Sequence, residues 1–415
     1  MKTGIYILLL SEIYFEFVKA NIKPIFPKES NFLERNNVSI SKEWYNHKNI
    51  SKPFEDQGFE DQGFEDQGLE DFTLHNFTEK TANFGFNLYR KIAMTHDNNV
   101  IISPLSVSAL MSVYMMAAKG ETYRQIVKGL NLHAVKDRAD RRHIPALFKQ
   151  LIGNITMNEE FVLVQVDFEN LTQAKLFINQ NINKMTKGKI PGLFDKLDCH
   201  NKLVLVDYIV FKGKWVYPFN SKFTEMEPFH INKYRSVQVP MMFKSDKINS
   251  TFDKNLRCTV IKIPYKGNAH MLLVIPEKEG DYISIEDHLT TELVESWLGN
   301  MKIRKVDISF PKFKLEQKYK MKNLLQGLGI KNLFTRSADL SHLTDHKYVA
   351  VSQIVQKAVI EVDEEGTEAA AASGSEITSF TVPPLIKVDR PFLFMIFEET
   401  FKTLLFIGRV VDPTE

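Results

Sequence analysis

Residues 364–384 read Glu-Glu-Gly-Thr-Glu-Ala-Ala-Ala-Ala-Ser-Gly-Ser-Glu-Ile-Thr-Ser-Phe-Thr-Val-Pro-Pro. If residues 367–379 form an extended strand, alternate residues share a face, and Glu368 and Glu376 fall on the same one. The opposite face carries no charge and mostly small side chains. Because a charge on an inward face would cost on the order of several kcal/mol, the pattern predicts a strand that can enter the middle of a sheet. The alternative is a flexible linker of small residues. Pro383-Pro384 ends any strand there.

The sequence on both sides of this segment predicts a globular α+β domain. Upstream, Phe77, Phe84, Leu88 and Ile92 recur at helical spacing, and Ser103-Pro104 is a typical helix start. Two more helices are expected, at Thr122–Leu130 and Arg138–Ile152. Strands are expected at Leu203–Phe211, Met271–Ile275, Val306–Phe310, Phe392–Phe397 and Leu404–Val411. The last two flank a Glu-Glu-Thr turn and predict a hairpin. Helices first and mostly strands afterwards indicate the α+β class.

The charge is unevenly distributed along the chain. The 415 residues include 53 Lys+Arg and 51 Asp+Glu, which gives a net charge of +2. Residues 54–71, however, hold eight acids and no base within a tandem Phe-Glu-Asp-Gln-Gly repeat. A five-residue period fits neither helix nor strand burial, and so charged a segment buries too little apolar surface to offset chain entropy. We therefore expect a disordered acidic extension at 21–71 and one large domain at 72–415.

The first 20 residues are typical of a weak secretory signal. Lys2 is the basic start, Ile5 to Leu10 are mostly apolar, and Ala20 is a small residue at a cleavage site. The alternative is an ordinary buried segment. Secretion is also favoured by six Asn-x-Ser/Thr acceptor sites, at Asn37, Asn49, Asn76, Asn154, Asn170 and Asn249. In an oxidising compartment, Cys199 and Cys258 either pair or stay free.

Several classes of function are disfavoured by the sequence. It contains no G-x-S-x-G, G-x-x-x-x-G-K-[ST], H-E-x-x-H or C-x-x-C motif, so we expect no enzyme. Its 11 histidines are scattered without metal-ligand spacing, so no metal site and no intrinsic cofactor are expected. No apolar run reaches the roughly 18–20 residues of a membrane span, and a near-neutral charge disfavours nucleic-acid binding.

Five motifs resemble the serpins, the serine-protease inhibitors that trap their target by a conformational change. In order they are Asn99-Val-Ile-Ile-Ser-Pro104, Phe211-Lys-Gly-Lys-Trp215, Phe310-Pro-Lys-Phe313, Glu364-Glu-Gly-Thr-Glu-Ala-Ala370 and Asp389-Arg-Pro-Phe-Leu-Phe394. The resemblance covers about residues 72–415. It implies helices packed around a large mixed main sheet and smaller sheets, with an exposed reactive loop at about 364–384, and we expect a monomer.

The resemblance also implies a mechanism. The serine of the target protease attacks the loop and forms an acyl-enzyme, after which the cut loop inserts into the main sheet. The family's register puts the reactive bond at Phe380–Thr381. The hinge of the inserting segment then comprises Glu364, Gly366, Thr367, Ala369, Ala370, Ala371 and Ala372. The small hinge residues favour an inhibitor, and the alternative is a non-inhibitory carrier serpin.

Residues 375–391 and the acid-rich tail resemble a serpin that acts in blood coagulation. This likeness implies factor Xa, and also factor XIa, as target proteases, with protein Z as cofactor and with calcium and phospholipid acting only through protein Z. The implied protein Z contacts are Met94, Asp97, Tyr234 and Asp287, whereas Asn232 stands where the relative has Asp. Phe380 suits an apolar primary pocket better than an acid-floored one, so the cofactor would have to compensate by raising the effective concentration.

The predicted helix at 138–152 carries basic residues where serpins often bind heparin. These residues are Arg138, Arg141, Arg142 and Lys149, and they fall roughly on one face. Such a row attracts sulfated glycosaminoglycan through counterion release. An ordinary solvated helix face is the alternative.

The region 154–173 is much shorter than the family pattern. One strand of the main sheet and one helix are expected to be missing near 155–172. Losing a strand would expose ladder groups and apolar core. Two explanations remain. Either the chain is a misassembled or alternatively spliced variant that folds poorly and is inactive, or residues 161–168 serve as one strand in place of two.

Overall fold

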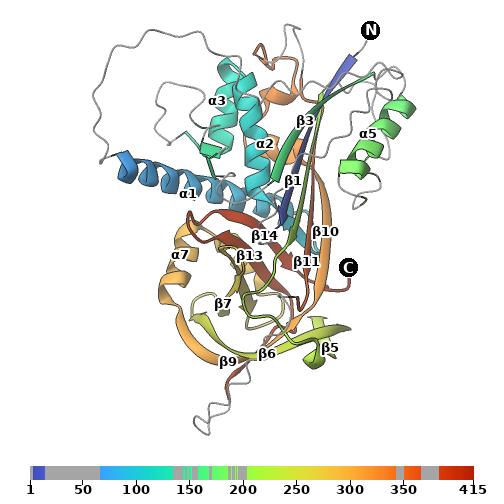
Figure 1. Ribbon diagram of the computed structural model, residues 1–415. Helices are drawn as coiled ribbons and strands as arrows, with labels where there is room; N and C mark the ends of the chain where they lie inside the picture. Colours follow the sequence, from blue (N-terminus) through green and yellow to red (C-terminus); the bar gives the residue numbers. More distant parts are fainter. Residues whose placement is uncertain are drawn as a thin grey trace, which may run out of the picture.

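The structure is a computed structural model. It describes residues 3–14, 66–133, 158–167, 171–185, 203–342, 350–365 and 383–415, with residues 144, 147, 148, 150, 151, 188, 192 and 194 between them. In these parts the chain forms a five-stranded and a nine-stranded sheet. Helices α1 and α3 each pack against α2 beside the sheets (Figure 1). The α+β class is therefore confirmed.

The first helices form where the sequence predicts them. Helix α1 spans Asp66–Ala93 and buries Phe77, Phe84, Leu88 and Ile92. It begins inside the acidic segment, ahead of the expected domain start at residue 72; the rest of that extension, residues 15–65, lies outside the described residues.

Helix α2 spans Pro104–Ala117, and the hydroxyl of Ser103 caps it by accepting from the backbone N–H of Ser106 at 3.4 Å. Gly85 brings α1 close to α2, because a Cβ there would lie 2.7 Å from Cβ of Pro104. Helix α3 spans Gly120–Gly129. The helix expected at 138–152 falls mostly outside the described residues.

The five-stranded sheet is mixed and has the order β10-β11-β4-β1-β3. Its strands are β10 (Phe313–Lys320), β11 (Gln353–Val362), β4 (Leu203–Lys212), β1 (Thr3–Tyr14) and β3 (Asn158–Asp167). Strand β4 runs parallel to both of its neighbours, β11 and β1. The outer pairs β10–β11 and β1–β3 are antiparallel.

The N-terminal segment occupies a place in this sheet that the sequence does not predict. Strand β1 pairs with β4 along Ile5–Tyr14 and with β3 along Thr3–Glu12. Strand β3 lies within the region 154–173, and β1, from the other end of the chain, stands between it and β4. The same residues form the apolar part of the expected secretory signal, which the structure does not test.

The nine-stranded sheet has the order β12-β9-β6-β7-β8-β13-β14-β2, with β5 paired to β6. Its strands are β2 (Val100–Ile102), β5 (Glu225–Asn232), β6 (Arg235–Asp253), β7 (Cys258–Tyr265), β8 (Ala269–Pro276), β9 (Lys302–Pro311), β12 (Leu385–Lys387), β13 (Phe392–Glu398) and β14 (Leu404–Val410). Strands β13 and β14 form the predicted hairpin. Gly408 admits β2 at its side, because a Cβ there would lie 2.4 Å from the carbonyl oxygen of Val100.

Aromatic side chains join the two sheets in one core. Phe211 of β4 packs edge-on against Phe406 of β14 at 5.4 Å, and Phe313 of β10 contacts Phe392 and Phe394 of β13. The remaining helices are α5 (Leu171–Met185), α6 (Tyr282–His288), α7 (Thr291–Asn300), α8 (Met321–Gly327), and the 3-10 turns η2 (Ser221–Phe223) and η3 (Asn332–Phe334). Of the helices in the described residues, none is long and apolar enough to cross a membrane.

Candidate functional site

The two ends of the predicted reactive loop are anchored in different sheets. Strand β11 leads into it from the five-stranded sheet and ends at Val362. On the far side, the backbone N–H of Asp307 donates to the carbonyl of Pro384 at 3.1 Å, and β12 then pairs with β9. Residues 366–382 lie outside the described residues. That range includes the predicted bond Phe380–Thr381 and the hinge residues from Gly366 to Ala372, so their positions stay predictions.

Glu364 is the predicted hinge residue that the structure describes, and two partners hold it. Its Oε2 lies 2.8 Å from Nζ of Lys312, and its Oε1 accepts from the hydroxyl of Thr224 at 2.9 Å. Burial acts to raise the pKa of Glu364, but the hydrogen bonds from Lys312, its own backbone and Thr224 outweigh it and lower the pKa. The start of the loop is therefore held by Thr224, which precedes β5, and by Lys312, which lies between β9 and β10.

A buried tryptophan fixes the residue before Glu364. The indole N–H of Trp215 donates to the carbonyl of Asp363 at 2.9 Å, and its ring stacks on Tyr265 at 4.2 Å between centroids. Nearby, Nζ of Lys212 at the end of β4 lies 3.3 Å from the carboxylate of Asp363. Lys212 also lies 3.5 Å from Glu361 and 3.9 Å from Glu365. The end of β4 is thus bound by charge to the end of β11.

A second, fully buried contact between β4 and β11 lies halfway along them. Asp207 of β4 stands directly opposite Gln356 of β11. Nε2 of Gln356 donates to Oδ2 of Asp207 at 2.7 Å, to the hydroxyl of Ser106 at 3.1 Å and to the carbonyl of Ser103 at 3.0 Å. The Ser106 hydroxyl donates to the same Asp207 oxygen. Burial raises the pKa of Asp207 to about 6, against the effect of the Ser106 and Gln356 hydrogen bonds.

This polar cluster, Ser103, Ser106, Asp207 and Gln356, was not predicted from the sequence. The available signal was a lone acid in the apolar run 203–211, since a buried carboxylate needs partners. Its physical role is to join α2, β4 and β11. Any strand that enters between β4 and β11 has to break it together with the parallel ladder.

The predicted protein Z residues Met94, Asp97 and Tyr234 lie on turns, and Asp287 lies in helix α6. Met94 is 78% exposed and Tyr234 is 87% exposed. Met94, Asp97 and Asp287 line one surface pocket of about 250 Å³, between the end of α1 and helix α6. Asn232 accepts from the backbone N–H groups of Tyr234 and Arg235 at 2.9 and 3.0 Å and so shapes the β5–β6 turn.

Buried charged side chains hold the backbone next to this pocket. Arg409 of β14 pairs with Glu286 at 3.0 Å, and Glu286 also accepts from the hydroxyl of Tyr89 at 2.5 Å. The guanidinium of Arg409 donates to the carbonyls of His96 and Asn98, and these two hydrogen bonds hold the turn after α1.

The turn that carries Tyr234 is connected to the turn after α1. Arg235 pairs with Asp412 at 3.0 Å, and the side chain of Asn99 donates to the carbonyl of Asp412 at 2.7 Å. Asn99 directly follows the residues of the Met94 turn, so the two turns share one support at the C-terminal end of the chain.

Other predicted sites divide between described and undescribed residues. The heparin residues Arg138, Arg141, Arg142 and Lys149 lie outside the described residues, as do Cys199 and the acceptor sites Asn37, Asn49, Asn154 and Asn170. Cys258 is a buried free thiol, and burial raises its pKa to about 12. Asn76 lies within α1, and the Thr78 of its acceptor triplet is buried. In the part of the chain that the structure describes, no three His, Cys, Asp or Glu residues are placed to hold a metal ion.

Comparison with known proteins assigns this arrangement. The family model described as "Serpin (serine protease inhibitor)" matches residues 79–163 and 148–413. Human protein Z-dependent protease inhibitor is 48% identical over 367 residues, which cover 81% of this chain and 82% of the relative. Rat alpha-1-antiproteinase is 34% identical over 363 residues, covering 80% of this chain and 88% of the relative.

A solved structure agrees with the sequence comparisons. The crystal structure of mouse protein Z-dependent protease inhibitor superimposes with a TM-score of 0.74 at 44% identity, covering 83% of this chain and all of that one. The two segments matched by the family model overlap at residues 148–163. The anchored loop ends, the mixed sheet and these matches lead to one conclusion: the chain belongs to the serpin family of serine protease inhibitors.

Proposed function

We propose that this serpin is a secreted inhibitor of a coagulation protease, with factor Xa as its target, factor XIa as a second target and protein Z as its cofactor. The proposal rests on one observation above all. Three of the four implied protein Z contacts, Met94, Asp97 and Asp287, line the same surface pocket. Support also comes from the 48% identity to a human relative named for its dependence on protein Z.

The inhibitory step follows from the covalent chemistry of the protease. Its serine attacks the carbonyl carbon of Phe380, the bond to the nitrogen of Thr381 breaks, and an acyl-enzyme remains. The loop is then cut after Phe380, while its N-terminal side stays continuous with β11. A strand that turns back from β11 runs antiparallel to β11, and also to β4, because β4 and β11 are parallel to each other. It can therefore pair on both edges between them.

Insertion has a barrier that the described contacts supply. Glu364 must lose its contacts with Lys312 and Thr224, and Gln356 must lose its hydrogen bond to Asp207. The uncharged face of residues 367–379 keeps the cost of burial low, because Glu368 and Glu376 lie on the other face. The protease is carried along before its acyl-enzyme is hydrolysed.

The cofactor compensates for a poor primary contact. Phe380 does not suit an acid-floored primary pocket. Protein Z, held on phospholipid with calcium, would concentrate both proteins on one surface and raise the effective concentration of the loop. A sulfated glycosaminoglycan at Arg138, Arg141, Arg142 and Lys149 would act in a similar way through counterion release.

The test is a gel assay with the full chain. Factor Xa incubated with the protein, protein Z, phospholipid and calcium should give a complex that survives SDS. Omitting protein Z should slow its formation by at least about tenfold, and a Phe380→Pro variant should form none. Cleavage at Phe380–Thr381 without a stable complex would contradict inhibition and favour the carrier alternative.

Two further measurements separate the alternatives. A trapping serpin gains thermal stability after loop cleavage because the inserted strand adds ladder pairs, whereas a carrier whose loop stays outside does not. A chain that folds poorly, as the short region 154–173 suggested, would show a broad, low-temperature transition by circular dichroism.

A further inference from the structure

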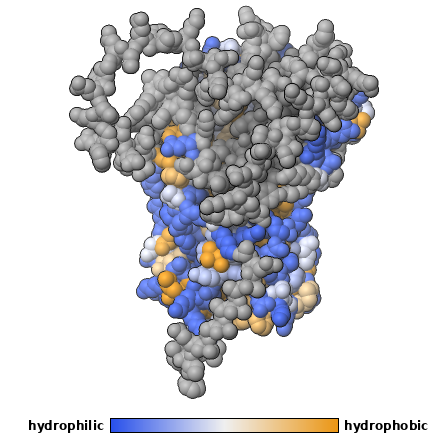
Figure 2. Space-filling view, viewed as in Figure 1, coloured by the Kyte–Doolittle hydropathy of each residue, from blue (hydrophilic) through white to orange (hydrophobic). Residues whose placement is uncertain are grey.

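Two buried residues near the C-terminus, Arg409 and Asp412, reach all three elements that carry the implied protein Z contacts. Arg409 is 3% exposed and Asp412 is 4% exposed, so they present almost no surface to a protein partner. On the face shown in Figure 2, the hydrophobic side chains of the described residues form small separate areas within a hydrophilic surface. Where apolar areas are small, recognition depends on how a few side chains are placed relative to one another.

Arg409 joins the turn after α1 to helix α6. Its guanidinium donates to the backbone carbonyls of the residues on either side of Asp97. It also pairs with the carboxylate of Glu286 at 3.0 Å, and Glu286 directly precedes Asp287 in α6. Two of the implied contacts, Asp97 and Asp287, are therefore positioned by one buried side chain.

Asp412 joins the β5–β6 turn to the same region. Its Oδ2 pairs with the guanidinium of Arg235 at 3.0 Å, and Arg235 directly follows Tyr234. The backbone of Asp412 bonds twice with the side chain of Asn99: its N–H donates to Oδ1 at 3.0 Å, and its carbonyl accepts from Nδ2 at 2.7 Å. The hydroxyl of Thr414 donates to the other carboxylate oxygen of Asp412 at 2.6 Å. Each oxygen of this buried carboxylate thus has a partner.

The side chains that these contacts position are themselves exposed. Met94 is 78% exposed and Tyr234 is 87% exposed. A loose turn has to be ordered when a partner binds, and that ordering costs affinity. Supporting residues that are fixed by packing and hydrogen bonds remove this cost.

We propose that Arg409 and Asp412 are positioning residues, which hold the turn after α1, helix α6 and the β5–β6 turn as one surface for protein Z. The inference rests on the proposed function, because that function names the partner. It adds that affinity for protein Z depends on buried residues of the C-terminal segment 409–412, which the amino-acid sequence does not link to any of the four contacts.

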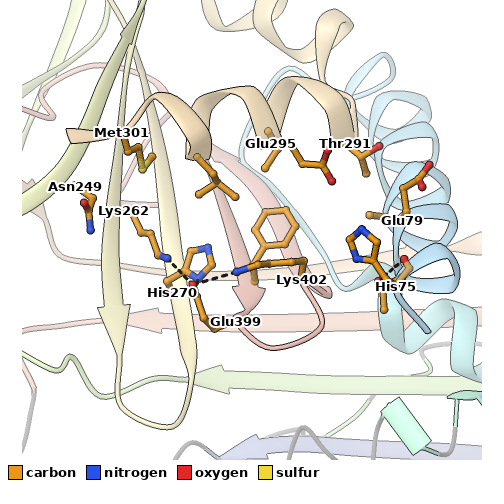
Figure 3. Close-up of a pocket in the computed structure, with 15 residues that line it drawn as sticks. His75, Glu79, Asn249, Lys262, His270, Thr291, Glu295, Met301, Glu399 and Lys402 are labelled. Atoms are coloured by element: carbon orange, nitrogen blue, oxygen red, sulfur yellow. Dashed lines mark hydrogen bonds and ion pairs between the residues drawn. The ribbon is translucent and has the colours of Figure 1, made fainter. Parts of the chain in front are cut away.

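A charged cluster at the other end of β14 supplies a control. Glu399, in the turn before β14, pairs with Lys262 at 2.8 Å and with Lys402 at 3.1 Å (Figure 3). Together with His270, these residues line a separate pocket of about 470 Å³, which shares no lining residue with the protein Z pocket. Glu399→Gln therefore breaks two ion pairs on the same hairpin but away from the proposed surface.

The test measures protein Z affinity by surface plasmon resonance on the full chain. Asp412→Asn keeps the size of the side chain and removes the charge that pairs with Arg235, so we expect binding about fivefold weaker. Arg409→Lys keeps a charge for Glu286 but loses the planar fork that reaches two carbonyls, and should weaken binding about tenfold. Glu399→Gln should stay within about twofold of the unchanged protein.

A second set of measurements separates positioning from a general loss of stability. Amide hydrogen exchange at residues 232–236 should become faster in Asp412→Asn and stay unchanged in Glu399→Gln, while melting curves record the stability of each variant. If Arg235 and Asp412 act through each other, the double variant Asp412→Asn with Arg235→Gln should bind protein Z no more weakly than the weaker-binding single variant. Formation of the factor Xa complex without protein Z should be the same for all variants.

Two outcomes would overturn this inference alone: a chain that binds protein Z equally well with and without Asp412→Asn, or an equal loss of affinity in Glu399→Gln. An unchanged chain that fails to bind protein Z would instead contradict the proposed function. In that case the hydrogen-exchange comparison still decides whether Asp412 positions the turn, and unchanged exchange in Asp412→Asn would overturn that role as well.

Discussion

Asp207 and Gln356 face each other across two parallel strands, and the amide of Gln356 donates to the carboxylate of Asp207 at 2.7 Å. The pair lies where a new strand would have to enter the sheet. Oδ1 of Asp207 and Oε1 of Gln356 have no hydrogen-bond partner among the described residues. The contact therefore joins the two strands but leaves two buried acceptor oxygens without a hydrogen bond, one of them on the Asp207 carboxylate. These unsatisfied oxygens lower the stability of the sheet in which β4 and β11 are paired.

Replacing Asp207 by Asn should stabilise the native protein at neutral pH. The folded-state pKa of about 6 lies above the ordinary 3.8, so the stability that this group contributes is present below pH 3.8 and is lost as the pH rises to 6. The cost at pH 7 is on the order of 3 kcal/mol. Asp207→Asn should recover up to this amount, measured as the urea midpoint at pH 7. The gain should shrink toward pH 4, and a gain that is constant with pH would contradict the assignment.

Weakening the anchor of Glu364 should speed loop insertion. Its ion pair with Lys312 is partly exposed and is worth about 1 kcal/mol. If the anchor breaks before insertion, Glu364→Gln should raise the rate about fivefold after loop cleavage by a non-target protease. The change is followed through the fluorescence of Trp215, which contacts Asp363. Glu279→Gln, at an exposed acid on the turn after β8, is the matched control and should have little effect; equal rates for all three proteins would refute the anchor.

Restoring an acid at position 232 should tighten protein Z binding. The side-chain oxygen of Asn232 accepts from two backbone N–H groups, and an Asp keeps both acceptors while adding a charge. We expect Asn232→Asp to raise the affinity three- to tenfold by surface plasmon resonance, with a gain that falls at high salt. Asn255→Asp places the same charge on a distant turn and serves as control. Unchanged or weaker binding by Asn232→Asp would contradict the proposed contact.

Ile283 should belong to the same interface, although the sequence did not identify it. It is 54% exposed and lines the pocket of Met94, Asp97 and Asp287. An exposed apolar side chain within a ring of charges is typical of a binding hot spot. Ile283→Ala should weaken protein Z binding about tenfold, whereas Ile303→Ala, an exposed isoleucine on β9 outside this pocket, should not. Equal effects of the two substitutions would remove Ile283 from the interface.

Removing residues 1–20 should destabilise the domain. Strand β1 pairs with β4 on one side and β3 on the other, and its loss leaves both ladders open. We expect the truncated chain to melt at least about 10 °C below the full chain. N-terminal sequencing of the mature protein shows which of the two forms is present. Identical melting temperatures would mean that β1 contributes little.

Much of this protein is predictable from local patterns. The spacing of Phe77, Phe84, Leu88 and Ile92 predicts α1, Ser103-Pro104 predicts the start of α2, and two apolar runs around a Glu-Glu-Thr turn predict the β13–β14 hairpin. These predictions succeed because the periodicity of a helix or strand is visible in residues that are close together in the sequence. The family motifs likewise led to the fold, because they are short stretches of sequence.

The contacts between distant residues required the tertiary structure. Asp207 and Gln356 are 149 positions apart, and Arg409 reaches Glu286 and the turn after α1 across more than a hundred residues. No period or spacing encodes such pairs, because they depend on which strands become neighbours.

The amino-acid sequence by itself determined helices α1, α2 and α3, the β13–β14 hairpin and the family. Only the tertiary structure decided that residues 3–14 stand between β4 and β3, and that Lys262, His270, Glu399 and Lys402 gather in one wall of a pocket. The physical reason is that periodicity acts over one or two turns of chain, whereas strand order and pocket lining arise when the whole core packs at once.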